Sequence, residues 1–141
     1  MKNVLLLMAC FLLIGTEEMM AGKKKVKQSK PEGAYQLIAQ LDGGKMVMVG
    51  YKNSNILFNN QTQKFNAYVG CNTISGVLNS GKRTLQLGQL TRTDKACPDY
   101  IDGLEEQFIK HLEQVNGFRW EGGTLMLMNN ETVLMKMKKK S

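Results

Sequence analysis

Closely spaced turn signals constrain this chain more than any other feature. Pairs such as Gly43-Gly44, Asn59-Asn60, Gly122-Gly123 and Asn129-Asn130 recur through the second half of the sequence and much of the first. Glycine and asparagine tolerate the positive φ of tight hairpin turns. The segments between them are too short for the helical crossovers that parallel strands require. The spacing therefore predicts antiparallel hairpins.

The runs between these turns have β-type composition. We predict nine strands at Ala34–Gln40, Lys45–Gly50, Ile56–Asn59, Lys64–Gly70, Ile74–Leu78, Thr84–Leu87, Gly117–Trp120, Thr124–Met128 and Thr132–Lys138. The fold class that follows is α+β but mostly β: a single antiparallel, barrel-like sheet with one amphipathic helix packed against it.

The helix is predicted from spacings of three and four residues between apolar side chains. The apolar stripe consists of Ile101, Leu104, Phe108, Leu112 and Val115. Charged residues are assigned to the opposite, solvated face: Asp102, Glu105, Glu106, Lys110 and Glu113. Pro98 and Asp99 supply the start signals, and Gly117 is expected to cap the C-terminal end.

The first 21 residues are predicted to be a cleavable export signal. Lys2 precedes an unbroken apolar run from Val4 to Ile14, which is shorter than the roughly 20 residues of a spanning helix. We expect cleavage after Ala21 and a product outside the cytoplasm, in the periplasm or cell envelope. The alternative is a lipoprotein, because Leu7-Met8-Ala9-Cys10 has the form of a lipobox in which Cys10 would be lipidated. Residues 22–33 are predicted to be a basic flexible lead-in, and residues 34–138 the domain.

The net charge of +7 comes from the two ends of the chain. Between Pro31 and Met135, six Lys and three Arg stand against ten Asp and Glu, a net charge of −1. The domain itself is therefore not basic, which argues against a nucleic-acid partner. The basic tails are read as solvated ends that could contact an anionic membrane surface weakly.

Several motifs in order resemble the META domain, also called the HslJ-like family. They are Gly70-Cys71-Asn72 with Gly76 after it, the stretch Leu90-Thr91-Arg92-Thr93-Asp94-Lys95-Ala96-Cys97, the helix, and Leu125-Met126-Leu127. The sequence departs from the family at Tyr35, where Trp is common, and at Lys95, where Met is common. The resemblance implies an antiparallel, barrel-like sheet with one helix in a bacterial envelope protein linked to stress tolerance. It implies no agreed biochemical activity.

Cys71 and Cys97 remain as an even pair once Cys10 is removed. In an oxidising compartment we expect a structural disulfide, the alternative being two buried free thiols. A bridged pair leaves no nucleophile for His111, the only histidine, and these three residues fit no zinc spacing. Glu105 and Glu106 are adjacent on a helix and do not form a carboxylate pair. We therefore predict neither an enzyme nor a cofactor.

Two further features bear on function. Asn72 is a candidate for a polar contact in a binding mouth, although a turn-fixing hydrogen bond is the favoured interpretation. The pairs Met46/Met48, Met126/Met128 and Met135/Met137 each place two thioethers on one strand face, and thioethers bind copper(I). Core packing is the favoured interpretation of these methionines. The leading hypothesis is an exported, non-enzymatic protein that binds a protein or peptide partner, and the alternative is periplasmic copper handling.

Overall fold

The computed structural model describes residues 29–50 and 52–141. The predicted signal segment, its lipobox Cys10 and most of the lead-in lie outside these residues. Within the described chain, no helix is long and apolar enough to cross a membrane.

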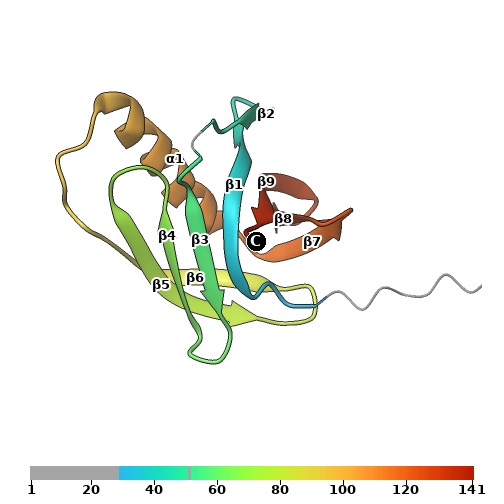
Figure 1. Ribbon diagram of the computed structural model, residues 1–141. Coiled ribbons are helices and arrows are strands. Elements are labelled where there is room, and N and C mark those ends of the chain that lie inside the picture. Colours follow the sequence, from blue (N-terminus) through green and yellow to red (C-terminus); the bar gives the residue numbers. More distant parts are fainter. Residues whose placement is uncertain (1–28, 51) are drawn as a thin grey trace, which may run out of the picture.

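All nine predicted strands and the single helix are present, and every strand pairing is antiparallel (Figure 1). Their bounds are β1 Gly33–Asp42, β2 Lys45–Met48, β3 Asn55–Asn59, β4 Lys64–Tyr68, β5 Thr73–Ser80, β6 Leu85–Arg92, α1 Asp99–Gln114, β7 Gly117–Glu121, β8 Thr124–Asn129 and β9 Thr132–Lys139. They form one sheet in the order β6-β5-β4-β3-β1-β9-β8-β7, and β2 pairs with β1 alongside this path. The predicted fold class is therefore confirmed.

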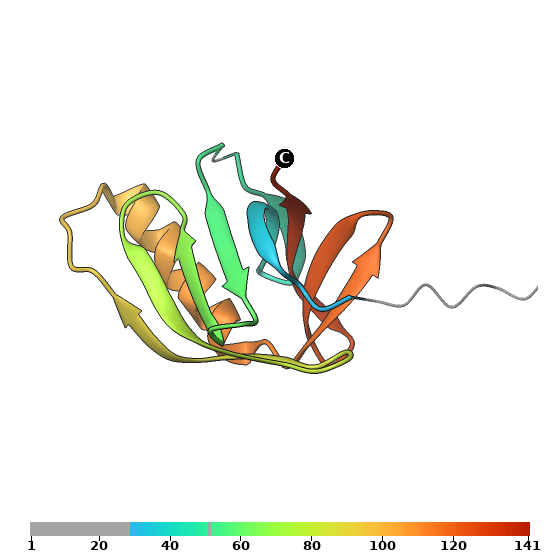
Figure 2. The same cartoon turned by 60° about the horizontal axis from the view of Figure 1, so that its bottom comes forward.

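The curled sheet closes at one point, which we call the barrel seam. Thr84, just before β6, bridges Gly117 at the start of β7. Around this bridge the main-chain N–H of Leu85 donates to Asn116 (3.3 Å) and that of Phe118 donates to Arg83 (3.1 Å). Because α1 connects β6 to β7, it remains beside this seam and lies against the inner side of the curled sheet (Figure 2).

One apolar core fills the space between the sheet and the helix. Phe58, Phe65 and Phe108 have essentially no exposed surface, and Phe108 comes from the middle of the predicted helical stripe. Tyr35 is also buried, and its ring centroid lies 5.7 Å from that of Phe58 and 6.0 Å from that of Trp120. Tyr35 thus serves as the aromatic anchor of β1.

Gly76 shows why one position of the motif must be glycine. A Cβ at this residue would lie 2.5 Å from the carbonyl oxygen of Gly88 and 2.6 Å from the Phe65 ring. The register of β5 against β6 also shifts between Ser75 and Val77. Only a residue without a side chain allows β6 and the core to approach β5 so closely.

Two expectations about the helix are wrong. Glu105, assigned to the solvated face, has no exposed surface at all. Gly117 does not cap the helix; α1 ends with an extended Val115 as its C-cap, and Gly117 is the first residue of β7. A Cβ at Gly117 would lie 3.0 Å from the carbonyl oxygen of Arg83, so the close approach at the barrel seam accounts for this glycine.

The packed domain also starts earlier than the predicted boundary at Ala34. Pro31 is buried, and its carbonyl accepts a hydrogen bond from Asn60 Nδ2 at 2.7 Å. Trp120 Nε1 donates to the carbonyl of Ser29 at 2.9 Å. Residues 29–33 are therefore attached to the domain and do not belong to the predicted flexible lead-in.

Candidate functional site

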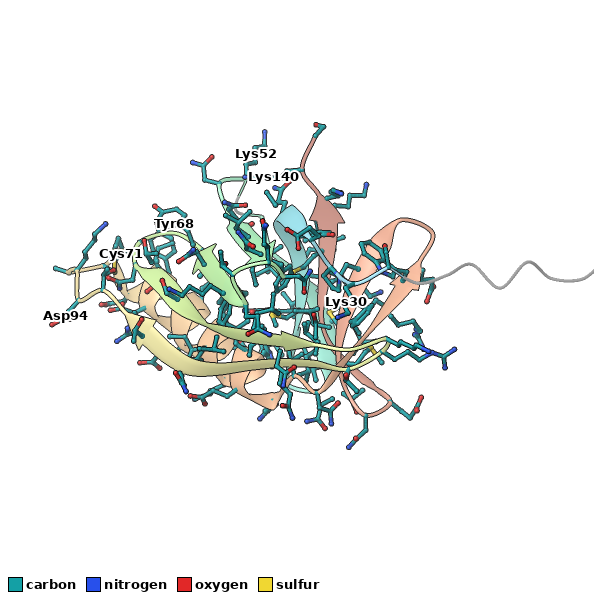
Figure 3. All side chains as sticks on the ribbon, turned by 90° about the horizontal axis from the view of Figure 1, so that it is seen from below. Lys30, Lys52, Tyr68, Cys71, Asp94 and Lys140 are labelled. Atoms are coloured by element: carbon teal, nitrogen blue, oxygen red, sulfur yellow. A yellow bond between two sulfur atoms is a disulfide. The ribbon has the colours of Figure 1, made fainter. Side chains whose placement is uncertain are left out.

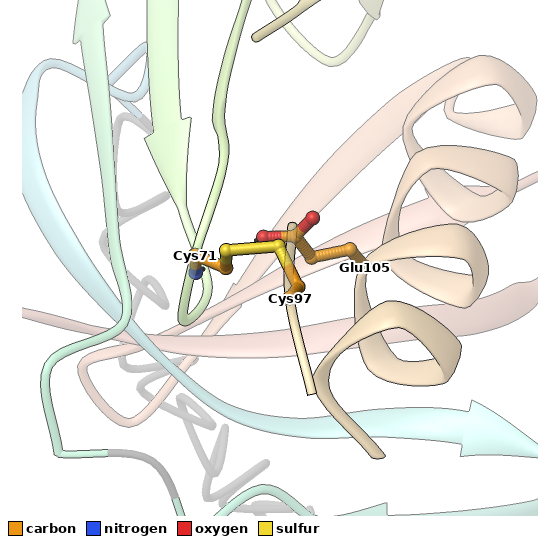
Figure 4. A group of neighbouring side chains, drawn as sticks. All are labelled: Cys71, Cys97 and Glu105. Atoms are coloured by element: carbon orange, nitrogen blue, oxygen red, sulfur yellow. Dashed lines mark hydrogen bonds between the residues drawn. A yellow bond between two sulfur atoms is a disulfide. The ribbon is translucent and has the colours of Figure 1, made fainter. Parts of the chain in front are cut away.

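The Cys71–Cys97 pair is bonded, as predicted. The bridge joins the turn between β4 and β5 to the segment that enters α1, with the two Cα atoms 6.0 Å apart (Figure 4). Cys71 lies with Tyr68 and Asp94 at one end of the molecule, away from Lys30 at the start of the described chain (Figure 3). The disulfide thus ties together two loops at that end.

Glu105 holds the same turn from the helix. Its Oε1 accepts the main-chain N–H groups of Cys71 (3.1 Å) and Asn72 (2.5 Å), and its Oε2 accepts Asn72 Nδ2 at 2.9 Å. No basic side chain pairs with this carboxylate among the residues that the structure describes. Charge-assisted hydrogen bonds are about twice as strong as neutral ones, so three of them can hold the buried carboxylate without a counter-ion.

Asn72 is the centre of this network. Its Nδ2 donates to Glu105 and contacts Cys97 Sγ at 3.2 Å, while its Oδ1 accepts hydrogen bonds from Thr93 Oγ1 (3.0 Å) and the main-chain N–H of Lys95 (2.8 Å). Only 2% of the residue is exposed. These are the contacts of a residue that fixes the turn, which is the interpretation that the sequence favoured over a binding contact.

The arrangement around the disulfide offers little chemistry in its bonded form. Cys71 Sγ, Cys97 Sγ and a Glu105 carboxylate oxygen lie within 4.8 Å of one another, but bonded sulfurs are not thiolate ligands. His111 belongs to a different region. Its Nε2 contacts the carbonyl of Leu41 at 2.7 Å, and its Nδ1 is buried without a partner. The two cysteines and the histidine therefore do not form a thiol–imidazole pair.

A hollow of about 380 Å³ opens between the β1–β2 hairpin and the N-terminal half of α1. We call it the mouth groove, and the residues that define it are Gln40, Asp42, Val47, Met48, Val49, Gly50, Tyr100, Ile101, Gly103, Leu104 and Gln107. Three of its apolar side chains are unusually exposed: Val47 by 45%, Met48 by 75% and Tyr100 by 72%. Leu104, predicted in the buried stripe, is only partly buried because it faces this groove.

Polar side chains join the two walls of the mouth groove beneath its apolar lining. Gln107 Nε2 donates to the carbonyl of Leu41 at 2.8 Å, and Gln40 Nε2 makes a long contact of 3.5 Å with Gln107 Oε1. Gln40 is 4% exposed, and its Oε1 has no hydrogen-bond partner. A buried acceptor without a donor costs about 1–3 kcal/mol. The protein itself supplies no donor to the Gln40 oxygen in this wall of the groove.

A second hollow of about 410 Å³ lies at the barrel seam. Its lining includes Arg83, Arg119, Asn130 and Glu131. None of the large, exposed apolar side chains in the described residues lies there. The mouth groove is therefore the better candidate for binding an apolar partner.

The six paired methionines do not converge. Met135 and Met137 belong to the core, and Met126 and Met128 are 4% and 5% exposed. Met126 lies beside Arg119, whose Nη2 is 3.7 Å from the Met126 sulfur. Met46 and Met48 are the more accessible pair, and two thioethers are a small ligand set for copper(I). These positions agree with core packing for Met135 and Met137, whereas Met126 and Met128 are buried on the opposite face of β8 from the core residues Leu125 and Leu127.

Sequence reasoning missed Glu105 and the mouth groove. The signal for Glu105 was present, because it lies four residues after Ile101 and three before Phe108, both of which are buried. Its spacing agrees with burial, whereas its charge is typical of a solvated face. The groove had no comparable local signal, since its two walls come from segments that are at least fifty residues apart in the sequence.

Comparisons with known proteins agree on the fold. The sequence profile of the META domain matches residues 28–141. No curated protein matches the sequence significantly. A protein from Burkholderia xenovorans solved by NMR has a TM-score of 0.59 at 17% identity, with 78% of this chain and 83% of that chain covered. A DUF4847 family protein from Bacteroides vulgatus, solved by crystallography, has a TM-score of 0.50 at 14% identity, with coverages of 76% and 92%.

Proposed function

The chain belongs to the META domain family, and from this premise we propose that it is an exported, non-enzymatic protein of the cell envelope that binds a protein or peptide partner in the mouth groove. One observation carries the proposal. Five large apolar residues are strongly exposed in the described chain, and three of them, Val47, Met48 and Tyr100, gather at one hollow. Grouped exposed apolar side chains mark interaction sites, whereas scattered ones do not.

The proposed compartment rests on the N-terminal sequence and on the disulfide. A short apolar run behind a lysine is typical of export signals, and disulfides persist outside the reducing cytosol. The resemblance to the family favours a bacterial envelope protein with a role in stress tolerance, and we propose both for the present chain. Lys138, Lys139 and Lys140 are exposed at the C-terminal end, and they suit a weak contact with an anionic membrane surface.

The copper alternative receives less support than partner binding. Four of the six candidate thioethers are buried, and coordination would require them to leave the core or the outer face of β8. Partner binding requires no such rearrangement, because the groove is already open to solvent.

A photo-crosslinking experiment tests the proposal. A benzophenone amino acid replaces Tyr100 in the groove or, as a control, Leu57, which is 40% exposed on β3. In intact cells that produce the protein, we expect a discrete adduct from position 100 and none from position 57. Adding Val47→Asp should abolish the adduct, whereas Val77→Asp, on a valine of similar exposure (39%) in β5, should leave it. Equal adducts from both positions would contradict the proposal.

A further inference from the structure

The strand beside the mouth groove has an open edge. β1 pairs with β9 along one side, and its other side is shared by β3, opposite Gly33–Tyr35, and β2, opposite Ala39–Asp42. β4 covers β3, but its last residue, Tyr68, lies opposite Asn55, the first residue of β3. β2 pairs with β1 alone in the part of the chain described. The sheet thus has a notch where β4 ends and β2 continues.

The main chain of β2 presents hydrogen-bonding groups to this notch. The N–H of Val49 donates to the carbonyl of Ile38 at 2.9 Å, so the main chain at Val49 faces β1. Successive residues of an antiparallel strand face alternate edges. Val47 therefore also faces β1, and Met46 and Met48 direct their N–H and C=O groups to the open side.

The side chains around the notch favour an extended apolar ligand. Val47 lies opposite Gln40 in the β1–β2 register, so a strand added beside β2 would have alternate side chains on the face of Val47, pointing into the mouth groove. The unpartnered Oε1 of Gln40 lies in that wall. A hydrogen-bond donor on the ligand would pair with this oxygen once the Gln40 amide turns toward the groove.

The groove itself adds a preference for charge. Asp42 is the one charged residue among those that line it. Asp42 is exposed and forms no ion pair with another described residue. Its carboxylate therefore complements a basic group on the ligand.

We propose that an extended segment of a partner protein binds by adding a strand to the open edge of β2, with apolar side chains in the mouth groove and a flanking Lys or Arg residue beside Asp42. This proposal rests on the proposed function and specifies its mode. It differs from simple docking in the groove because main-chain hydrogen bonds to Met46 and Met48 supply part of the affinity.

The test uses a short capped peptide of alternating valine and threonine with lysine at its ends. Titration is followed by NMR, and the amide exchange rates of Met46 and Met48 are compared with and without peptide. We expect slower exchange at these two amides. The same peptide N-methylated at alternate residues should bind at least about fivefold more weakly if it loses even one hydrogen bond, and a version with glutamate ends should also bind more weakly.

A pair of variants tests the edge from the protein side. Met48→Pro removes the outward N–H without removing a bond to β1, and proline is tolerated on edge strands. Met48→Ala removes only the side chain. We expect Met48→Pro to bind the peptide at least about fivefold more weakly than Met48→Ala. Should Met48→Pro unfold, the N-methylated peptide still decides the question on the unaltered protein.

The outcomes separate the two proposals. Equal binding of the N-methylated and unmodified peptides overturns strand addition. If Val47→Asp then abolishes the binding of both peptides, the peptides bind in the mouth groove without adding a strand. Failure of every peptide to bind or to slow exchange overturns strand addition, while the crosslinking experiment judges groove binding independently. A concentration-dependent dimer with protected Met46 and Met48 amides would identify a second copy of the chain as the occupant of the edge. It would overturn the proposal that a partner protein binds there.

Discussion

Glu105 accepts two hydrogen bonds from Asn72: Oε1 accepts one from the main-chain N–H at 2.5 Å, and Oε2 accepts one from the side-chain amide at 2.9 Å. This pair links α1 to the β4–β5 turn across 33 residues of sequence, beside the disulfide. Neither residue reaches solvent to any extent. The carboxylate therefore acts as a fixed acceptor for the turn.

Glu105→Ala should be strongly destabilising. It leaves the N–H groups of Cys71 and Asn72 and the Asn72 amide without their acceptor, and each hydrogen bond to a charged group contributes about 1.5–3 kcal/mol. We expect the free energy of unfolding to fall by about 3 kcal/mol or more in urea titrations. Glu106→Ala, on the exposed neighbour, should change it by less than about 0.5 kcal/mol. Equal effects would show that the buried network is not formed in solution.

The phase of the helix can be tested with two aromatic residues. Phe108 has no exposed surface, and Tyr100 is 72% exposed on the same helix. Phe108→Ala should cost about 3–5 kcal/mol, a large part of the 5–15 kcal/mol typical of a domain. Tyr100→Ala should leave the melting temperature nearly unchanged. If the two variants melt alike, the helix does not bury the face described above.

Removing the disulfide should lower stability in oxidising buffer. Its two cysteines are separated by 26 residues, for which the loop-entropy estimate is about 3.5 kcal/mol. We expect Cys71→Ser combined with Cys97→Ser to show this loss in thermal unfolding. In reducing buffer the wild type loses the same constraint, so the gap between the two proteins should shrink. Two freely alkylated thiols in the native protein from its own compartment would refute the bridge.

Two glycines of the β5–β6 pair provide a matched comparison. A Cβ at Gly76 would meet the Gly88 carbonyl and the Phe65 ring, whereas a Cβ at Gly88 would meet nothing within 4 Å. Gly76→Ala should therefore cost about 1–3 kcal/mol through overpacking. Gly88→Ala should be tolerated. Urea denaturation of both variants measures the difference, and similar midpoints would argue against the close approach.

Tyr35 should make stability fall at alkaline pH. Burial raises the pKa of its hydroxyl above the ordinary value of 10.0, the nearby Glu32 carboxylate raises it further, and the hydrogen bond to the Glu32 main chain opposes this. The unfolded chain therefore loses this proton at a lower pH than the folded protein. The stability that the protonated Tyr35 hydroxyl contributes is complete below pH 10.0. It is lost as the pH rises from there toward the folded-state pKa. In Tyr35→Phe, unfolding free energies measured across this range should decline less steeply than in the wild type.

The sequence by itself determined the elements of this fold. Glycine and asparagine pairs located the hairpin turns, and apolar spacing located α1 with Ile101, Phe108 and Leu112 on its buried face. The cysteine count and the predicted compartment also led to the correct disulfide. These signals are legible because backbone conformation and helical phase depend on neighbouring residues, whose chemistry is visible in a short window.

Only the tertiary structure decided the burial of Glu105, the role of Gly117 and the mouth groove. Glu105 is buried because three N–H donors from a distant turn meet it, and Gly117 begins β7 because the barrel seam brings Arg83 against it. The open edge of β2 depends on where β4 stops pairing with β3. Helical spacing places Glu105 beside the buried residues Ile101 and Phe108, but it does not show that donors are there to receive the carboxylate. That outcome, like the other two, is set by the register and packing of segments far apart in the chain.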